Sequence, residues 1–263
     1  TCTTGAAATD FTYIGQPFSY FNAPELLITA KNLSGVITKN YTEPNYQKLT
    51  AADIERTYPI VDTSKNGADN TTKMAISAVT NAGSLVKSAD GVLKFTFSTL
   101  DTFTYIKNDN SQSTPFTMEY DIVIDKIRDV DGANASNYLA SNIPTTNTVS
   151  PMGVNLRFGR LYVENTFGPE TSSLPLPIFT QYWDGSRFLV NTLDNSCTTF
   201  DAANLTIDDT ALNPGTTNAV GSGVFANGET LNVIFSAPGT SNQGAVPVIY
   251  NTLSMPWLLY DWS

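Results

Sequence analysis

The most constraining feature of the sequence is a run of alternating side chains at residues 115–126, PFTMEYDIVIDK. An apolar side chain recurs there at every second position, at Met118, Tyr120, Ile122 and Ile124. A period of two places these four side chains on one face of an extended strand. We therefore predict a strand with one face in a hydrophobic core and the other in water.

Further segments have the same character. Residues 154–163 (VNLRFGRLYV) alternate, and two stretches with a turn between apolar runs predict hairpins, at 25–41 and 179–191. Residues 256–262 (PWLLYDW) predict a buried closing strand, and only residues 51–58 have some helical character. Short strands separated by Gly, Asn and Asp turns are typical of sandwiches and barrels. The expected fold class is all-β.

The best candidate boundary is the stretch after the first alternating run. Residues 129–150 are rich in Asp, Gly, Asn, Ser and Thr, which is typical of a long loop. We predict an immunoglobulin-like β-sandwich with an N-terminal lead over residues 1–128. A linker or long loop would follow over 129–151, and a second sandwich or jelly-roll-like unit over 152–263.

Charge is scarce and mostly negative. Only 14% of the 263 residues are charged, against about 25% in an average soluble domain, and the net charge is −10. Such a surface disfavours nucleic acid and anionic membranes as partners. No apolar run approaches the ~20 residues of a membrane span, so we expect no membrane insertion. The first residue is Thr1 rather than Met, which predicts a processed product or a piece of a longer chain.

The two cysteines, Cys2 and Cys197, both lie in polar, Thr-rich surroundings, TCTT and NSCTTF. Inert thiols more often occur inside apolar runs. Together with the low-charge composition, this context favours a disulfide formed in an oxidising compartment. A pair of free thiols in a reducing compartment is the alternative.

Histidine is absent from the sequence. Its absence removes Ser-His-Asp and Cys-His nucleophilic sites and most zinc sites, and no CxxC or Gly-rich phosphate loop occurs. Carboxylates such as Glu164, Glu170 and Asp184 could serve a glycosidase, but nothing in the sequence fixes a pair at the required separation. We therefore predict a protein that is not an enzyme, with a glycoside hydrolase as the least favoured alternative.

Two ligand sites are conceivable. Asp125, Asp129 and Asp131 place carboxylates on a predicted loop, as a calcium site requires, although Asp-Gly turns need no metal. Tyr182 and Trp183 could stack on a sugar ring, although alternating aromatic residues more often belong to a core. The scarce arginines Arg157 and Arg187 are predicted on strands beside aromatic residues, where structural pairing or stacking is favoured.

Several segments together resemble the C-terminal domain of the MSHA (mannose-sensitive haemagglutinin) pilus biogenesis protein MshQ family. The segments are FTYIGQPF (11–18), LLITAKNLSGVITKNY (26–41), RFGRLYVENTFGPETSSLPLPIFTQYWDGSRF (157–188), DNSCT (194–198) and PWLLYDW (256–262). They follow the family's order over nearly the whole chain.

The resemblance implies an exported protein of a Gram-negative bacterium, encoded beside a type IV pilus. The family's cysteines correspond to Cys2 and Cys197, which supports their pairing. No catalytic residue is carried over from it. We therefore expect an extracellular or pilus-associated structural or adhesive module whose partners are pilins, other surface proteins or glycans, with a calcium-dependent lectin-type adhesin as the alternative.

Overall fold

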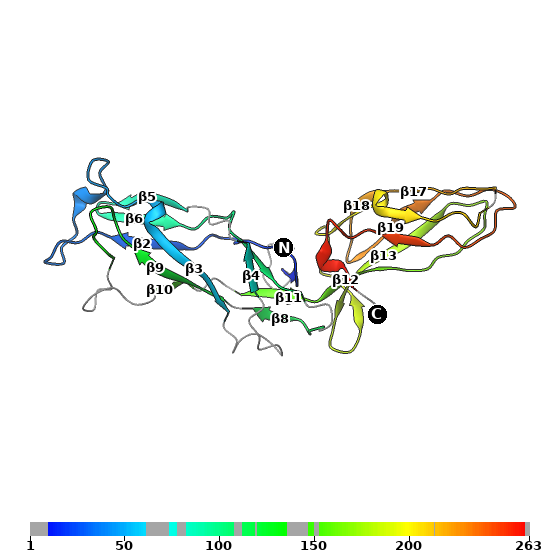
Figure 1. The fold of residues 1–263 in the computed structure, drawn as a ribbon, viewed down its shortest axis with the longest axis horizontal. Coiled ribbons are helices and arrows are strands. Elements are labelled where there is room, and N and C mark those ends of the chain that lie inside the picture. The colour runs from blue at the N-terminus through cyan, green and yellow to red at the C-terminus, as the bar shows by residue number, and fades with distance from the viewer. Residues whose placement is uncertain are drawn as a thin grey trace.

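The computed structural model describes residues 10–61, 74–77, 83–107, 112–118, 120–135, 147–149, 153–212 and 214–260 (Figure 1). Within these residues the helical segments are 3₁₀ turns of three or four residues: η1 (Lys39–Thr42), η2 (Ala51–Asp53), η3 (Ala202–Asn204) and η4 (Pro256–Leu258). The remaining regular structure is β. The prediction of an all-β protein made of β-sandwich units is confirmed, and the immunoglobulin-like and jelly-roll-like assignments stay predictions.

The first unit is built from four small sheets. Their strand orders are β2-β6-β5, β10-β9-β3, β1-β11-β8 and β4-β7. The strands are β1 (Thr12–Tyr13), β2 (Glu25–Thr29), β3 (Ile54–Val61), β4 (Met74–Ser77), β5 (Ser84–Ala89), β6 (Val92–Thr96), β7 (Thr102–Tyr105), β8 (Phe116–Met118), β9 (Tyr120–Ile127), β10 (Asn147–Val149) and β11 (Val154–Arg157).

The alternating run that predicted one strand forms two, β8 and β9, in different sheets. Met118 from β8 and Ile122 and Ile124 from β9 nevertheless lie buried in the same core. The predicted buried face is confirmed at these three residues, because alternation reports which face is buried and not which strand is the neighbour. Val123, on the face predicted to lie in water, is also buried, and the side chain of Tyr120 lies outside the described residues. A chain that passes from one sheet to the next keeps its period of two.

Aromatic rings dominate the core of the first unit. Phe95 and Phe103 are fully buried, and Phe95 and Phe97 pack edge to face with their centroids 5.3 Å apart. The Arg56 guanidinium on β3 lies 5.3 Å from the ring centroid of Phe95 and 5.0 Å from that of Phe97. Its Nη1 atom is 3.5 Å from Asp101 Oδ2. A buried guanidinium is tolerated here because a carboxylate and two ring faces surround it.

The second unit contains a sheet of order β12-β13-β19-β17, with β14 added beside β13, and two strand pairs, β15-β18 and β16-β20. Ile178, Phe225 and Val233 are fully buried between them. The strands are β12 (Gly159–Val163), β13 (Leu174–Trp183), β14 (Phe188–Val190), β15 (Thr199–Asp201), β16 (Leu205–Ile207), β17 (Ala219–Val220), β18 (Ser222–Val224), β19 (Glu229–Phe235) and β20 (Val248–Tyr250).

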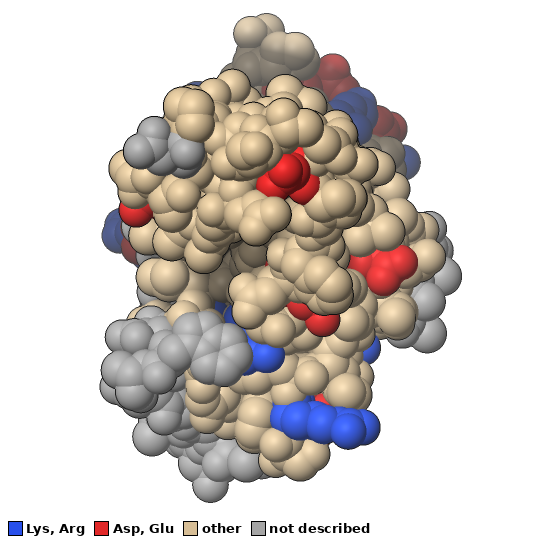
Figure 2. All heavy atoms as spheres, turned by 90° about the vertical axis from the view of Figure 1, so that its right-hand side faces the viewer, with Lys and Arg blue, Asp and Glu red and all other residues tan. Residues whose placement is uncertain are grey.

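The two units lie end to end along the long axis (Figure 1). Viewed from the free end of the second unit, the surface is largely uncharged, with scattered acidic side chains and few basic ones (Figure 2). The sparse charge of the composition is therefore visible on the folded surface.

The boundary between the units lies later than predicted. Residues 147–149, inside the predicted linker 129–151, form β10 and pair with β9. Strand β11, predicted to begin the second unit, pairs with β8 and β1 in the first. The second unit therefore begins at β12. The prediction differs because the Asx- and Ser-rich composition that suggested a linker is equally typical of loops within the first unit.

The local predictions fared unequally. The hairpin over 179–191 is confirmed as β13 and β14. The hairpin over 25–41 is confirmed only around its turn. The Asn32 N–H donates to the Val36 carbonyl and the Thr38 N–H donates to the Ala30 carbonyl, on either side of an antiparallel bridge between Lys31 and Ile37. The predicted second strand does not form, since β2 pairs with β6 and the chain leads into η1. The segment 256–262 was also wrongly predicted as a strand, since its first three residues form η4.

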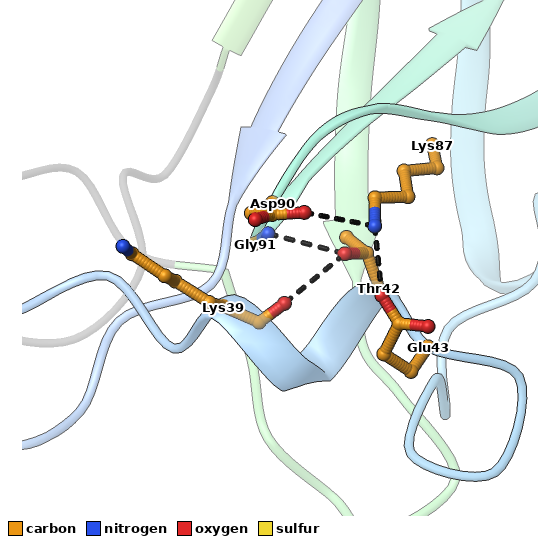
Figure 3. Close-up of polar contacts among 6 residues, drawn as sticks. All are labelled: Lys39, Thr42, Glu43, Lys87, Asp90 and Gly91. Atoms are coloured by element: carbon orange, nitrogen blue, oxygen red, sulfur yellow. Dashed lines mark hydrogen bonds and ion pairs between the residues drawn. The ribbon is translucent and has the colours of Figure 1, made fainter.

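Polar contacts fasten η1 to the β5–β6 turn at the far end of the first unit (Figure 3). Lys87 pairs with Glu43 at 2.7 Å and with Asp90 at 2.9 Å. The Gly91 N–H donates to Thr42 Oγ1 at 3.1 Å, and that hydroxyl donates to the Lys39 carbonyl at 3.2 Å. The exposed ion pairs contribute little, so Gly91 and Thr42 hold this turn in place.

Substitution of Gly91 tests that contact. Gly91 has φ +72°, and a Cβ there would lie 2.5 Å from Ile37 Cγ2 and 2.8 Å from the Thr38 carbonyl oxygen. We expect Gly91→Ala to lower the free energy of unfolding by about 2–4 kcal/mol, from backbone strain plus the clash. Gly35→Ala is the matched control, because Gly35 has φ +79° with open space around it, and should cost about 1–2 kcal/mol. Equal losses in urea unfolding would contradict the role of packing at Gly91.

Candidate functional site

The junction between the two units is where buried polar and charged side chains gather. One residue, Phe158, separates β11 of the first unit from β12 of the second, and its side chain is buried in the core of the first unit. Gly159 follows, and a Cβ there would lie 2.3 Å from the ring of Tyr13. The chain therefore crosses between the units without a linker, through a place packed too closely for a side chain at residue 159.

Tyr13 joins the N-terminal strand to the second unit. Strand β1 runs parallel to β11, and the Tyr13 side chain is 1% exposed. Its hydroxyl donates to Asp194 Oδ2 at 2.9 Å and accepts from Asn191 Nδ2 at 2.7 Å. Both partners are fully buried in the second unit, so this hydroxyl forms a hydrogen-bonded bridge between the two units.

The buried Asp194 carboxylate receives further donors. The Thr198 N–H donates to Oδ1 at 3.0 Å, and the Thr198 hydroxyl donates to Oδ2 at 2.6 Å. Asn191 in turn accepts from Arg157 Nη1 at 2.5 Å. Removing a carboxylate from water is costly unless several donors replace the water, and this network supplies them from both units.

Of the two arginines predicted on strands beside aromatic residues, Arg157 and Arg187, only Arg157 lies on a strand and stacks on a ring. Arg160, for which no role was predicted, stacks as well. The Arg157 guanidinium lies 4.3 Å from the centroid of Tyr182, and that of Arg160 lies 3.8 Å from Phe188. Trp183, Phe188 and Tyr260 pack against the core of the first unit. The two predicted sugar-stacking residues are thus half-buried: Tyr182 faces Arg157, and Trp183 packs in the junction. The prediction for Arg187 is wrong, because it lies exposed in the β13–β14 turn with its Nε 4.0 Å from Asp184.

Lys107, two residues after the end of β7, holds the C-terminal segment. Its ammonium donates to the carbonyl oxygens of Gly159, Trp257 and Leu259 at 2.9, 2.8 and 2.5 Å, and it lies 4.7 Å from the centroid of Phe158. Three carbonyls match the three N–H groups of an ammonium. Lys107 therefore fastens η4, at the end of the second half of the sequence, to the first unit.

Cys197 lies beside the N-terminal strand. It packs, half-buried, against a cluster that contains Phe11, Tyr13, Met255 and Leu258, and its sulfur is disulfide-bonded. Cys2 lies outside the described residues, so the pairing of Cys2 with Cys197 stays a prediction. The position of Phe11, nine residues after Cys2, agrees with it.

The geometry gives no support to the predicted calcium site. Among the described residues no group of three or more His, Cys, Asp or Glu side chains could hold a metal ion. Asp129 Oδ1 accepts from the N–H groups of Asp131 and Ala133, and Oδ2 accepts from the Tyr41 hydroxyl at 3.0 Å. Burial and this hydrogen bond raise the pKa of Tyr41 to about 12. Asp129 therefore stabilises a loop through hydrogen bonds. This agrees with the alternative interpretation in the sequence analysis, that an Asp-Gly turn needs no metal.

The carboxylates considered for glycoside hydrolysis also have local partners. Asp184 Oδ1 accepts from the N–H groups of Ser186 and Arg187, and these bonds lower the pKa of Asp184. Glu170 Oε1 accepts from the Ser241 N–H. Each of these two side chains thus orders a turn.

These contacts define an all-β protein of two units joined by a shared interior. Two family models match consecutive parts of the chain: DUF6701, third domain, over residues 1–153, and DUF6701, fourth domain, over residues 157–263. The chain belongs to the DUF6701 family. Searches of curated proteins and of solved structures give no match. The gap between the two models, 153 to 157, falls next to the crossover at Phe158.

Most of the junction was missed by reasoning from sequence. Tyr13, Asn191, Asp194 and Lys107 carry no motif, and the Tyr13–Asp194 contact joins residues 181 apart in sequence. The one available signal was the resemblance, because Tyr13 lies in the segment FTYIGQPF and Asp194 opens DNSCT.

The pH dependence of stability tests the Tyr13 bridge. Burial, and then the charge of Asp194, raise the pKa of Tyr13 well above 10. Above pH 10 the unfolded chain loses this proton while the folded chain keeps it, so stability falls with rising pH by up to about 1.4 kcal/mol per unit. Tyr13→Phe should cost about 1–3 kcal/mol at pH 7 and lack this decline, so the difference between the two proteins should narrow above pH 10. A constant difference up to pH 11 in urea unfolding would contradict the bridge.

The disulfide has a direct test. Alkylation of the unfolded, unreduced protein should modify neither cysteine, and peptide mass spectrometry should recover a fragment that joins Cys2 to Cys197. Loss of the link in Cys2→Ser should lower the midpoint of thermal unfolding, because a long closed loop no longer restrains the unfolded chain. Two alkylated thiols in protein isolated without reductant would refute the pairing.

Proposed function

We propose that this chain is a non-catalytic structural or adhesive module of an exported bacterial surface protein, in which two β units act as one rigid body. The junction is the observation that carries the proposal. Domains within one chain usually meet through modest, polar interfaces and move relative to each other. Here the crossover residue is buried. In addition, the N-terminal strand β1 contacts the second unit, and the C-terminal segment around η4 contacts the first unit.

Two independent contacts between the units support rigidity. Tyr13 ties the N-terminal strand to Asp194 and Asn191, and Lys107 ties the C-terminal segment to the first unit. Rotation of one unit against the other would break both and expose a buried carboxylate. Fixed orientation is the property expected of a rigid spacer or of a module that presents a surface at a distance.

The surface composition supports an extracellular setting. Charge is replaced by Thr, Asn and Ser, and Cys197 is oxidised. No helix among the described residues is long and apolar enough to cross a membrane. The association with a type IV pilus, and with pilins or other surface proteins as partners, rests on the resemblance to the MshQ family.

The lectin-type alternative finds less support in the geometry. Sugar binding by Tyr182 and Trp183 needs an exposed ring face. The Arg157 guanidinium lies over the ring of Tyr182, and Trp183 contacts Phe188 edge to face at 5.2 Å. We therefore favour protein contacts over glycan contacts for this module.

Small-angle scattering tests the rigidity. We expect the wild-type chain to scatter as a single elongated body with one dominant conformation. Lys107→Met removes the donor to three carbonyls and should broaden the distribution of interdomain distances while both units stay folded. Lys94→Met is the matched control, because Lys94 pairs with Glu25 on the surface of β6 and β2, and it should change nothing. A wild-type chain that already samples many orientations would refute the proposal.

Surface exposure tests the cellular setting. Antibodies against this chain should label intact cells of the source bacterium, and protease treatment of intact cells should remove the epitope. Label that appears only after lysis would contradict an extracellular role. A deletion confined to these two units should leave pilin synthesis unchanged and reduce attachment or surface assembly, whereas normal attachment and assembly would contradict a structural or adhesive role.

A further inference from the structure

The β2-β6-β5 sheet has two edges of different character. Strand β5 forms one edge, and it has features that keep an edge strand from pairing: a register shift between Lys87 and Ala89, and a lysine side chain that binds Glu43. Strand β2 forms the other edge. Its register with β6 is continuous from Glu25 to Thr29, and it contains neither proline nor lysine. One edge of this sheet is therefore protected and the other is not.

The backbone of β2 presents hydrogen-bonding groups along its unprotected edge. Its bonds to β6 are made at even-numbered positions, from the Pro24 carbonyl at one end to the Ala30 N–H at the other. Because the direction of these groups alternates along a strand, those of Glu25, Leu27 and Thr29 point away from β6. Among the described residues, no hydrogen bond to the N–H or C=O groups of these three occurs. They form an open template for another strand.

The side chains at the centre of β2 are apolar on both faces of the sheet. On the outer face Leu27 is 68% exposed and lies beside Lys94 of β6, and Val86 of β5 lies on the other side of Lys94. On the inner face Leu26 and Ile28 pack against the core of the first unit but stay half-buried. A further strand would therefore cover apolar surface on both faces.

A second copy of β2 is complementary to this edge. In an antiparallel pair with its two-fold axis at Leu27, each Leu27 lies opposite its own counterpart, and Glu25 lies opposite Thr29 of the second copy. On the inner face, Leu26 lies opposite Ile28 of the second copy. The two Glu25 carboxylates are then at opposite ends of the interface, whereas a register centred on Glu25 would place them together. The register centred on Leu27 also pairs every outward-pointing backbone group of the strand.

We propose that the β2 edge is a self-association surface, on which two copies of this chain pair through antiparallel β2 strands. The two sheets then form one continuous sheet of order β5-β6-β2-β2-β6-β5, related by a two-fold axis. The register shift and Lys87 at each outer edge stop the sheet from growing, so the assembly closes as a dimer. The inference goes beyond the proposed function and does not depend on the rigidity of the junction, so its failure would leave that function standing.

Sedimentation velocity on the whole chain tests the self-association. We expect a monomer–dimer equilibrium over a concentration series. Because each copy carries a net charge of −10, added salt should screen the repulsion between the copies and strengthen the dimer. A wild-type chain that stays monomeric up to its solubility limit at high salt overturns the proposal and leaves the edge to a strand of another protein. A dimer that weakens with salt also overturns it, because ion pairs would then hold the interface.

Charge at the centre of the edge tests the register. Leu27→Lys places two ammonium groups opposite each other, and Leu27→Glu places two carboxylates there. Each variant alone should dimerise at least about tenfold more weakly than the wild type. A mixture of the two variants should form heterodimers, because opposite charges then meet at the two-fold axis.

Val86→Lys is the matched control for these variants. Val86 is 48% exposed on the same face and also lies beside Lys94, but it belongs to the protected edge, so this variant should dimerise like the wild type. Both substituted side chains are exposed, so all variants should keep the wild-type midpoint of thermal unfolding at concentrations where the chain is monomeric. Wild-type dimerisation of the L27K variant, equal weakening by V86K, or a mixture of L27K and L27E that stays monomeric would each overturn the proposal.

Discussion

The structure depends on a buried carboxylate, that of Asp194, whose hydrogen-bond donors come from both units. Asp194 receives donors from its own loop through Thr198 and from the N-terminal strand through Tyr13. Because an unsatisfied charge in this interior is costly, the Tyr13 hydroxyl fixes the position of β1. Strand β1 in turn lies against β11, and β11 leads directly into β12. The relative placement of the two units therefore follows from where one carboxylate obtains its hydrogen bonds.

The fold class could be predicted from sequence because burial has a period. Met118, Ile122 and Ile124 are all buried, as the alternation indicated. Strand partners could not be predicted in the same way. The run 154–163 alternates without interruption, yet Phe158 divides it between two sheets in two units. A period of two records which side of a strand faces the core, and it carries no information about which sheet the strand joins.

The candidate site was harder to predict for a different reason. Arg157 was correctly assigned a structural, stacked role, since a guanidinium beside aromatic residues on a strand has few other stable arrangements. Asp129 and Asp194 look alike in sequence, as acids within polar turns, yet one caps an exposed loop and the other is fully buried. Asp194 differs in its hydrogen bond to Tyr13, a residue remote in sequence. No local sequence pattern predicts that contact.

The distance along the chain between Tyr13 and Asp194 also orders the events of folding. A strand whose decisive partner lies 181 residues later stays incomplete until most of the polypeptide is present, since the entropy of closing so long a loop must be offset by contacts formed at the end. A chain delivered N-terminus first can assemble the β2-β6-β5 sheet early, whereas β1 has to wait. We therefore expect the junction between the two units to be the last part of this protein to form and the part most in need of protection during folding.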